Sequence, residues 1–191
     1  LSAIWDPAAL IFVAAGIFAP GIGRTLSYVG IEKIGVARSV PIANSSPIFA
    51  SIFAVIFLGE TWILQNVIGT SLVIGGVVLL SMAKPPRGEW RKLDVIYPLI
   101  GAVAFGASTN LRKVGLGFID SPLLAAAVTS LTAALFSFTL LQIQGGKHAF
   151  KLNRKSAAWL FPAGAFNTTA MLSVFFALSH GKVVIVEPLV S

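Results

Sequence analysis

The chain has 191 residues, of which 56% are hydrophobic and only 11% charged, and its net charge is +7. A soluble domain carries about 25% charged residues, so this composition excludes a soluble globular protein and predicts a chain whose apolar surface faces lipid. The absence of cysteine excludes disulfides, thiolate metal sites and cysteine nucleophiles, and we expect neither a bound metal nor another cofactor.

Apolar runs long enough to cross a bilayer recur along the chain, since a spanning helix needs about 20 such residues. In chain order they predict helices at about 8–31, 39–58, 62–82, 94–111, 121–143 and 157–178, with a seventh that begins near 183. The runs are too long and too continuously apolar for the alternating strands of a membrane barrel. The predicted fold is therefore an all-α integral membrane protein, a polytopic bundle with about six and a half helices in this chain.

Several residues near the helix ends have structural interpretations. Glu60 follows Gly59 and is expected to place its carboxylate at the free N–H groups of the next helix. Arg112 and Lys113 are expected to close the fourth helix as interface anchors. Ala102 and Gly106, four residues apart, would let two helix backbones approach closely, although small residues are also simply common in membrane helices.

The basic residues are unevenly divided between the two sides of the membrane. If every run spans, the loops near 33–38, 84–92 and 147–155 share one side and hold most of the Lys and Arg residues. Cytoplasmic loops of membrane proteins collect such residues. This rule predicts that the segment 84–93 is cytoplasmic, and it explains the positive charge without a nucleic-acid partner.

A weak internal repeat appears at a shift of 147 residues. Residues 28–41 and 175–188 share a helix end, a short polar loop and an early proline, and Val36 and Pro41 match Val183 and Pro188. The repeat predicts that 1–83 holds the last three helices of a first five-helix unit. Residues 84–93 would then be a linker, and 94–191 would open a second unit. An odd number of helices inverts the second copy, and the chain would be a piece of a longer protein.

Three segments resemble the EamA-type permeases of the drug/metabolite transporter superfamily. Pro41 to Pro47, with the later Phe57-Leu58-Gly59-Glu60, is similar to the fourth helix of these proteins, Ile68 to Leu80 to the fifth, and Gly101 to Lys113 to the sixth. The resemblance implies ten helices in two inverted halves, a multi-pass protein of the plasma (inner) membrane, and alternating access around a central cavity. Members commonly start in the cytoplasm, which would place 84–93 outside, so both orientations stay open.

Two groups of residues are candidates for contact with a transported compound. Arg24 lies deep in the first apolar run, where a charge usually faces a cavity or a partner, and Tyr28 is one turn away; the alternative is an arginine that snorkels to the interface. Between Pro41 and Pro47, Asn44 and Ser45 lie where an opened helix would expose carbonyls. The alternative there is a plain kink.

Glu187 is the one carboxylate placed within an apolar span, directly before Pro188. It could take up a proton and couple transport to a proton gradient, or simply lie at a helix N-terminus. Asn110 and Asn167 either line the cavity or bond between helices. The predicted substrate-binding residues are Arg24, Tyr28, Asn44, Ser45, Asn110 and Asn167, with Glu187 for proton coupling and Pro41, Pro47 and Pro188 as helix breakers.

These features predict a secondary transporter, a permease or exporter of a small metabolite or drug, and not an enzyme. An intramembrane enzyme is the alternative, but the sequence has no His-Glu-x-x-His or Gly-x-Ser-x-Gly motif. A channel or a non-transporting bundle is the third reading, without a repeated selectivity loop to favour it. The expected partners are the lipid bilayer and a small-molecule substrate, and both a monomer and a homodimer fit.

Overall fold

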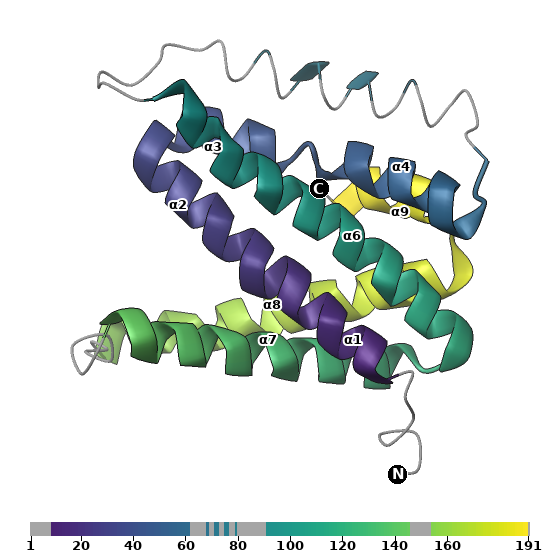
Figure 1. Cartoon of the computed structure of the whole chain (residues 1–191). Coiled ribbons are helices and arrows are strands. Elements are labelled where there is room, and N and C mark those ends of the chain that lie inside the picture. The colour runs from purple at the N-terminus through teal and green to yellow at the C-terminus, as the bar shows by residue number, and fades with distance from the viewer. Residues whose placement is uncertain are drawn as a thin grey trace.

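The computed structural model describes residues 9–61, 91–145 and 154–190, with a few isolated helical positions between 68 and 79. Most of the predicted helix 62–82 and most of the segment 84–93 lie outside the described residues. Within the described ranges every regular element is a helix and no strand occurs, so the predicted all-α bundle is confirmed (Figure 1). The elements are α1 (Ala9–Gly16), η2 (Ile17–Gly23), α2 (Arg24–Ile34), α3 (Val36–Ala43), α4 (Ser46–Leu58), η3 (Lys92–Val95), α6 (Ile96–Phe118), α7 (Pro122–Gly145), α8 (Arg154–His180) and α9 (Val183–Val190).

Three helical stretches among the described residues are long and apolar enough to cross a membrane. They are Ala9–Ile34, Val36–Leu58 and Pro122–Ile143, with mean hydropathies of 1.7, 1.7 and 1.9. The outer faces of these helices expose large apolar side chains, including Ile56, Phe57, Leu131 and Leu135. Such faces would be unfavourable in water and suit contact with lipid.

The first stretch is one continuous helix that widens in its middle. Residues Ile17–Gly23 form the π-helical segment η2, with Pro20 inside it. Proline lacks the N–H that an α-helix needs, and the wider turn follows from this loss. Two side chains of the next turn bond to carbonyls of this segment, since Thr25 Oγ1 donates to Gly21 O at 2.7 Å and Ser27 Oγ donates to Gly23 O at 2.9 Å.

The second stretch is interrupted between its two prolines. Helix α3 contains Pro41 and ends at Ala43, and α4 begins at Ser46 with Pro47 in its first turn. Asn44 and Ser45 form the turn between them, with ψ near 2° at both residues. Glycines mark both outer ends of this stretch, since Gly35 and Gly59 have φ values of 80° and 66°, which other residues rarely adopt.

Helix α6 lies at the centre of the bundle and contacts α1, η2, α2, α3, α4, α7, α8 and α9. It runs from Ile96 to Phe118, two turns beyond the predicted end at 111. The expectation that Arg112 and Lys113 close this helix is therefore wrong, because both lie in its interior. Two adjacent charges usually mark a helix end, so the sequence did not predict that the helix continues past them. In the structure Arg112 is buried among other helices, and Lys113 bonds to carbonyl groups at the end of α8.

Close backbone contacts hold α6 against its neighbours. A side-chain Cβ on Gly106 would lie 2.6 Å from the backbone nitrogen of Ala50 in α4, too close for any other residue without a shift. The prediction of close helix approach at Gly106 is thus confirmed. At the α1–α6–α8 contact, Phe12 and Phe175 pack edge to face with ring centroids 6.4 Å apart, and both side chains are fully buried.

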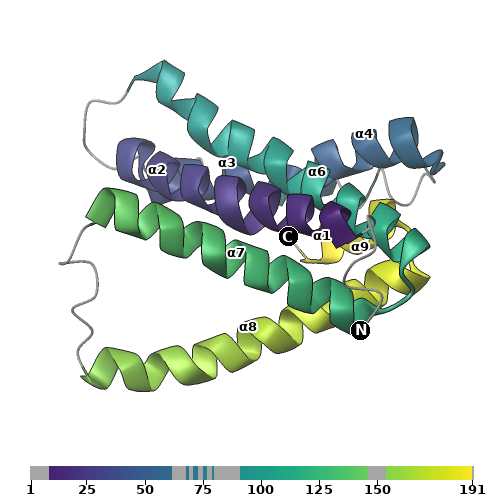
Figure 2. The ribbon, with the colours of Figure 1, turned by 60° about the horizontal axis from the view of Figure 1, so that its bottom comes forward.

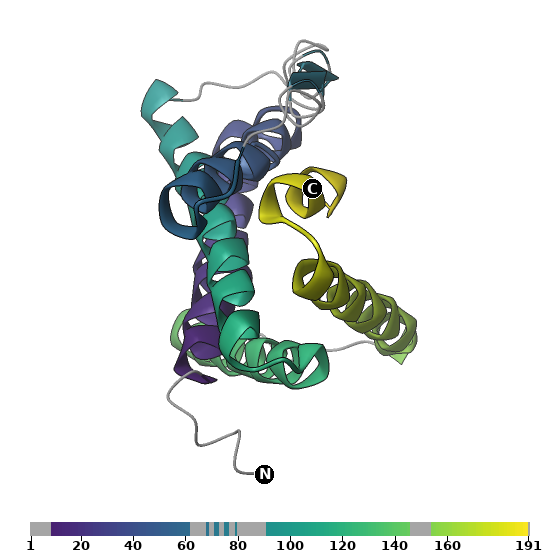
Figure 3. The same ribbon diagram turned by 90° about the vertical axis from the view of Figure 1, so that its right-hand side faces the viewer.

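The remaining helices complete an open arrangement around α6. Helices α7 and α8 contact one another and diverge toward the ends joined by 146–153 (Figure 2). Figure 3 shows α8 and α9 facing α2 and α6, with α9 beside α4. Segments from both ends of the chain therefore surround one interior region.

Candidate functional site

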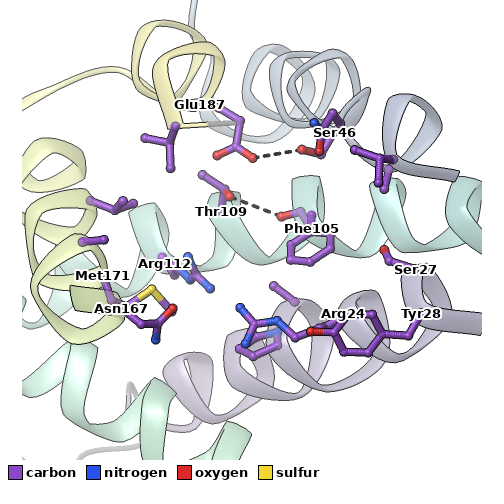
Figure 4. A pocket seen from close by; sticks show the side chains of 18 of the residues that line it. Arg24, Ser27, Tyr28, Ser46, Phe105, Thr109, Arg112, Asn167, Met171 and Glu187 are labelled. Atoms are coloured by element: carbon purple, nitrogen blue, oxygen red, sulfur yellow. Dashed lines mark hydrogen bonds between the residues drawn. The ribbon is translucent and has the colours of Figure 1, made fainter. Parts of the chain in front are cut away.

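A cavity of about 470 Å³ lies in this interior region. Its walls come from η2 and α2, from α3 and the start of α4, and from α6, α8 and α9. Ligand cavities in proteins have volumes of roughly 300–1,000 Å³. Figure 4 shows that charged and polar side chains from these helices converge on the cavity from opposite sides.

The acidic side of the cavity is formed by Glu187 of α9. Its side chain is only 8% exposed, and Ser46 Oγ, at the start of α4, donates to Glu187 Oε1 at 3.4 Å. The hydroxyl of Thr109 lies beside the same carboxylate and bonds to Phe105 O at 3.2 Å within α6 (Figure 4). Three helices distant in sequence thus surround one carboxylate.

The basic side of the cavity is formed by Arg24 of α2 and Arg112 of α6. Arg112 is 7% exposed, its Nε has no hydrogen-bond partner, and its guanidinium carbon lies 5.4 Å from the ring centre of Phe175. Arg24 is exposed to the cavity. Arg112 interacts electrostatically with Arg24 and with Glu187, so the three charges share one field.

Local structure explains why these side chains meet. Phe105, Thr109 and Arg112 are spaced by four and three residues, so they lie on one face of α6. Arg24 is the first residue after the π-helical segment. Because a π-turn holds more residues than an α-turn, this segment rotates Arg24 and every later side chain about the helix axis. Ser46 faces the cavity at the point where the helix interruption ends.

Five of the residues predicted to act in transport line the cavity: Arg24, Tyr28, Asn44, Asn167 and Glu187. Ser45 and Asn110 do not. The Ser45 hydroxyl donates to Ile42 O at 2.6 Å and completes the turn between α3 and α4. Asn110 Nδ2 donates to Ala50 O and Gly106 O, each at 2.9 Å, and so joins α6 to α4.

Arg112 is the cavity residue that the sequence misassigned, since its type and position indicated an interface anchor. The signal that would have found it is the polar stripe formed with Thr109 on one helix face. That stripe becomes visible only when α6 is continued past residue 111.

In the part of the chain that the structure describes, no group of three His, Asp or Glu side chains could hold a metal ion.

Comparison with known proteins gives a family match for the first part of the chain. Residues 2–82 match the profile of the EamA-like transporter family. The resemblance of this segment to an EamA-type permease is thus confirmed. It contains the interrupted helix α3–α4, Arg24 and Glu60.

Curated relatives are similar over parts of the chain. A WAT1-related protein of Arabidopsis thaliana is 32% identical over 89 residues, which are 44% of this chain and 24% of the relative. Putative sugar uptake proteins of Bacillus cereus and Bacillus anthracis are 34% identical over 68 residues, 34% of this chain and 24% of each relative. The match thus spans about a quarter of the length of these relatives. No solved structure matches the chain.

The family and the lipid-facing helices together make this chain part of a multi-pass membrane protein. The matched family is one of transporters, which favours transport over catalysis.

Proposed function

We propose that the intact protein is a secondary transporter that moves a small metabolite or drug across the plasma membrane by alternating access. The observation that carries the proposal is the cavity, in which Arg24, Arg112 and Glu187 converge from three helices inside an otherwise apolar bundle. Charges at membrane depth are costly and mark substrate or ion pathways. In this proposal the two inverted five-helix halves rock around the cavity.

The interrupted helix α3–α4 supports the same function. Transporters use broken helices at the substrate site, because the break leaves polar backbone groups where a compound can bind. Here Asn44 lies in the break and lines the cavity, together with Ser46. Substrate contact by Arg24, Tyr28, Asn44 and Asn167 is part of the proposal, whereas Ser45 and Asn110 are assigned to the support of the helices.

Transport itself is tested in bacterial cells that express the intact gene. Compounds inside and outside the cells are compared for wild type, an empty vector, the Arg24→Ala, Asn44→Ala double variant and the Arg91→Ala control, whose side chain is exposed at the start of η3. We expect a small set of compounds to be redistributed by wild type and the control, and not by the double variant at equal membrane abundance. Failure of wild type to move any compound across several media would refute the proposal.

We further propose that Glu187 couples transport to a proton gradient. A largely buried carboxylate that feels the charge of Arg112 can alternate between charged and neutral forms as the cavity opens to either side. Uptake or export driven by wild type should then fall when a protonophore collapses the gradient. Glu187→Gln should remove this sensitivity, whereas Glu32→Gln, on an exposed helix end, should keep it. Wild-type transport that ignores the protonophore would exclude proton coupling.

A further inference from the structure

We propose that Arg24 and Arg112 jointly bind a carboxylate group of the substrate, so that the transported compounds are small monoanionic carboxylates. This inference rests on the proposed transport function and specifies the chemical class that the cavity selects. It is argued from the missing hydrogen-bond acceptor of Arg112, from the position of Arg24 and from the sum of the charges that line the cavity.

Arg112 is a buried cation whose Nε lacks a hydrogen-bonding partner among the described residues. Only 7% of its surface is exposed, and its Nε is without an acceptor. Among the described residues, the ion pair that forms is Lys33 Nζ with Asp94 Oδ1 at 3.9 Å, and Arg112 takes no part in one. Its contact with the Phe175 ring positions the guanidinium but supplies no acceptor. A buried charge left in this state is unfavourable, and the cavity beside it is the place from which an acceptor can come.

Glu187 does not fill that place in this structure. Its carboxylate is held on the α4 and α9 side of the cavity by the hydroxyl of Ser46, beside Thr109. It feels the charge of Arg112 without forming an ion pair with it. Glu187 therefore leaves the Nε of Arg112 without an acceptor, and a ligand in the cavity can interact with this guanidinium.

Arg24 supplies a second guanidinium from a different helix. Figure 4 shows Arg24 and Arg112 both directed into the space beside Asn167, and the two cations repel each other. An anion placed between them removes this repulsion and gives each a partner. Guanidinium groups suit this task because their planar N–H pairs match the two oxygens of a carboxylate or a phosphate.

The charge balance distinguishes these two anions. With Glu187 ionised, the three charged side chains Arg24, Arg112 and Glu187 would give the cavity a net charge of +1. A carboxylate brings this sum to zero, whereas a phosphate monoester carries about −1.5 to −2 near neutral pH and would overshoot it. The remaining wall includes Phe105, Met171 and Val174, which suits a largely apolar body attached to a single carboxylate.

The inference is tested by binding to the purified full-length protein. Thermal unfolding in detergent is followed with two pairs of probes, lactate with lactamide and benzoate with benzamide, and with phenyl phosphate as the dianion. Each amide keeps the shape of its acid but lacks the charge. We expect at least one acid to raise the Tm of wild type in the millimolar range, and its amide to have no effect.

Variants connect the binding to the two arginines. Arg112→Gln and Arg24→Gln should each weaken acid binding at least tenfold, and Arg112→Lys, which keeps the charge but loses the planar donor pair, should give an intermediate value. Arg91→Gln is the matched control and should bind as wild type does. If Arg112→Gln fails to accumulate, Arg24→Gln and Arg112→Lys carry the test.

Several results would overturn the inference. They are equal Tm shifts with acid and amide, no shift with any probe, an acid effect that survives both glutamine variants, or a larger shift with phenyl phosphate than with benzoate. The transport assay separates this failure from failure of the proposed function. If the protein moves only neutral or cationic compounds, carboxylate selection is refuted and the transport function stands. If it binds the acids but moves no compound, the transport function is refuted and carboxylate binding stands.

Discussion

The carboxylate of Glu60 caps the helix that begins at Val183, 123 residues further along the chain. Its Oε1 accepts the backbone N–H of Val183 at 3.0 Å, and its Oε2 accepts that of Val184 at 3.1 Å. Glu60 follows the left-handed Gly59, and its own N–H donates back to Ala54 O at 3.2 Å, which closes the end of α4. The same residue thus ends one helix and caps another, and it fixes α9, which carries Glu187, against α4.

Replacement of Glu60 should loosen this contact. Glu60→Ala removes both acceptors at the helix N-terminus and should lower the free energy of unfolding by about 1–2 kcal/mol. Thermal unfolding of the purified protein in detergent measures the effect, with exposed Glu32→Ala as control. A Glu60→Ala protein as stable as the control would show that the cap is dispensable.

Lys113 holds the other side of the same junction. Its Nζ donates to Leu178 O and Gly181 O, both at 2.7 Å, at the C-terminal end of α8, where a positive charge is favourable. Lys113→Met keeps the apolar stem and should cost about 1–3 kcal/mol of stability, because two charge-assisted hydrogen bonds are lost. Exposed Lys182→Met is the control and should have little effect.

The two contacts are also expected to depend on one another. Glu60 and Lys113 bind the two ends of the short α8–α9 connection, so loss of one frees the segment that the other holds. The double variant should therefore be less destabilised than the sum of the single variants, by about 0.5 kcal/mol or more. Strict additivity in this double-mutant cycle would mean that the two anchors act independently.

Gly106 should tolerate no side chain at the α4–α6 contact. In Gly106→Ala the added Cβ meets the backbone of Phe49 and Ala50 at 2.6–3.0 Å, and the helices must separate at a cost of about 1–3 kcal/mol. Gly117→Ala on the same helix is the matched control, since nothing lies within 4 Å of its added Cβ. Equal thermal stability of the two variants would contradict the close approach.

Asn110 is expected to matter for stability and not for selectivity. Asn110→Ala loses the bond to Ala50 O that links α6 to α4, and interhelical hydrogen bonds in membranes contribute about 0.6 kcal/mol on average. Its Tm should fall slightly, and the set of transported compounds should stay that of wild type. Thr139→Ala, whose hydroxyl bonds only within its own exposed helix turn, serves as control. A changed set of transported compounds would instead indicate that Asn110 contacts the substrate.

The amino-acid sequence was enough to predict the class of the protein and the position of most of the described helices. Apolar runs of spanning length leave a lipid-facing helix as the stable solution, because every backbone hydrogen bond must be made within the segment. The same reasoning offered an opened helix near Asn44 as one of two interpretations of its two prolines, and it predicted Arg24 and Glu187 as charges within apolar spans, with an interfacial position as the alternative for each. These are local properties, readable from residue type and spacing.

Which charges share the cavity and which stabilise the fold depends on how the helices pack. Arg112 and Lys113 are adjacent in sequence, yet α6 directs Arg112 into the cavity and Lys113 to the end of α8. Glu60 was expected at the helix after it, and its two oxygens are bound by α9. The partner of each group comes from a helix many residues away, so helix packing, which no local pattern encodes, determines whether a charge is an anchor, a cap or a binding group.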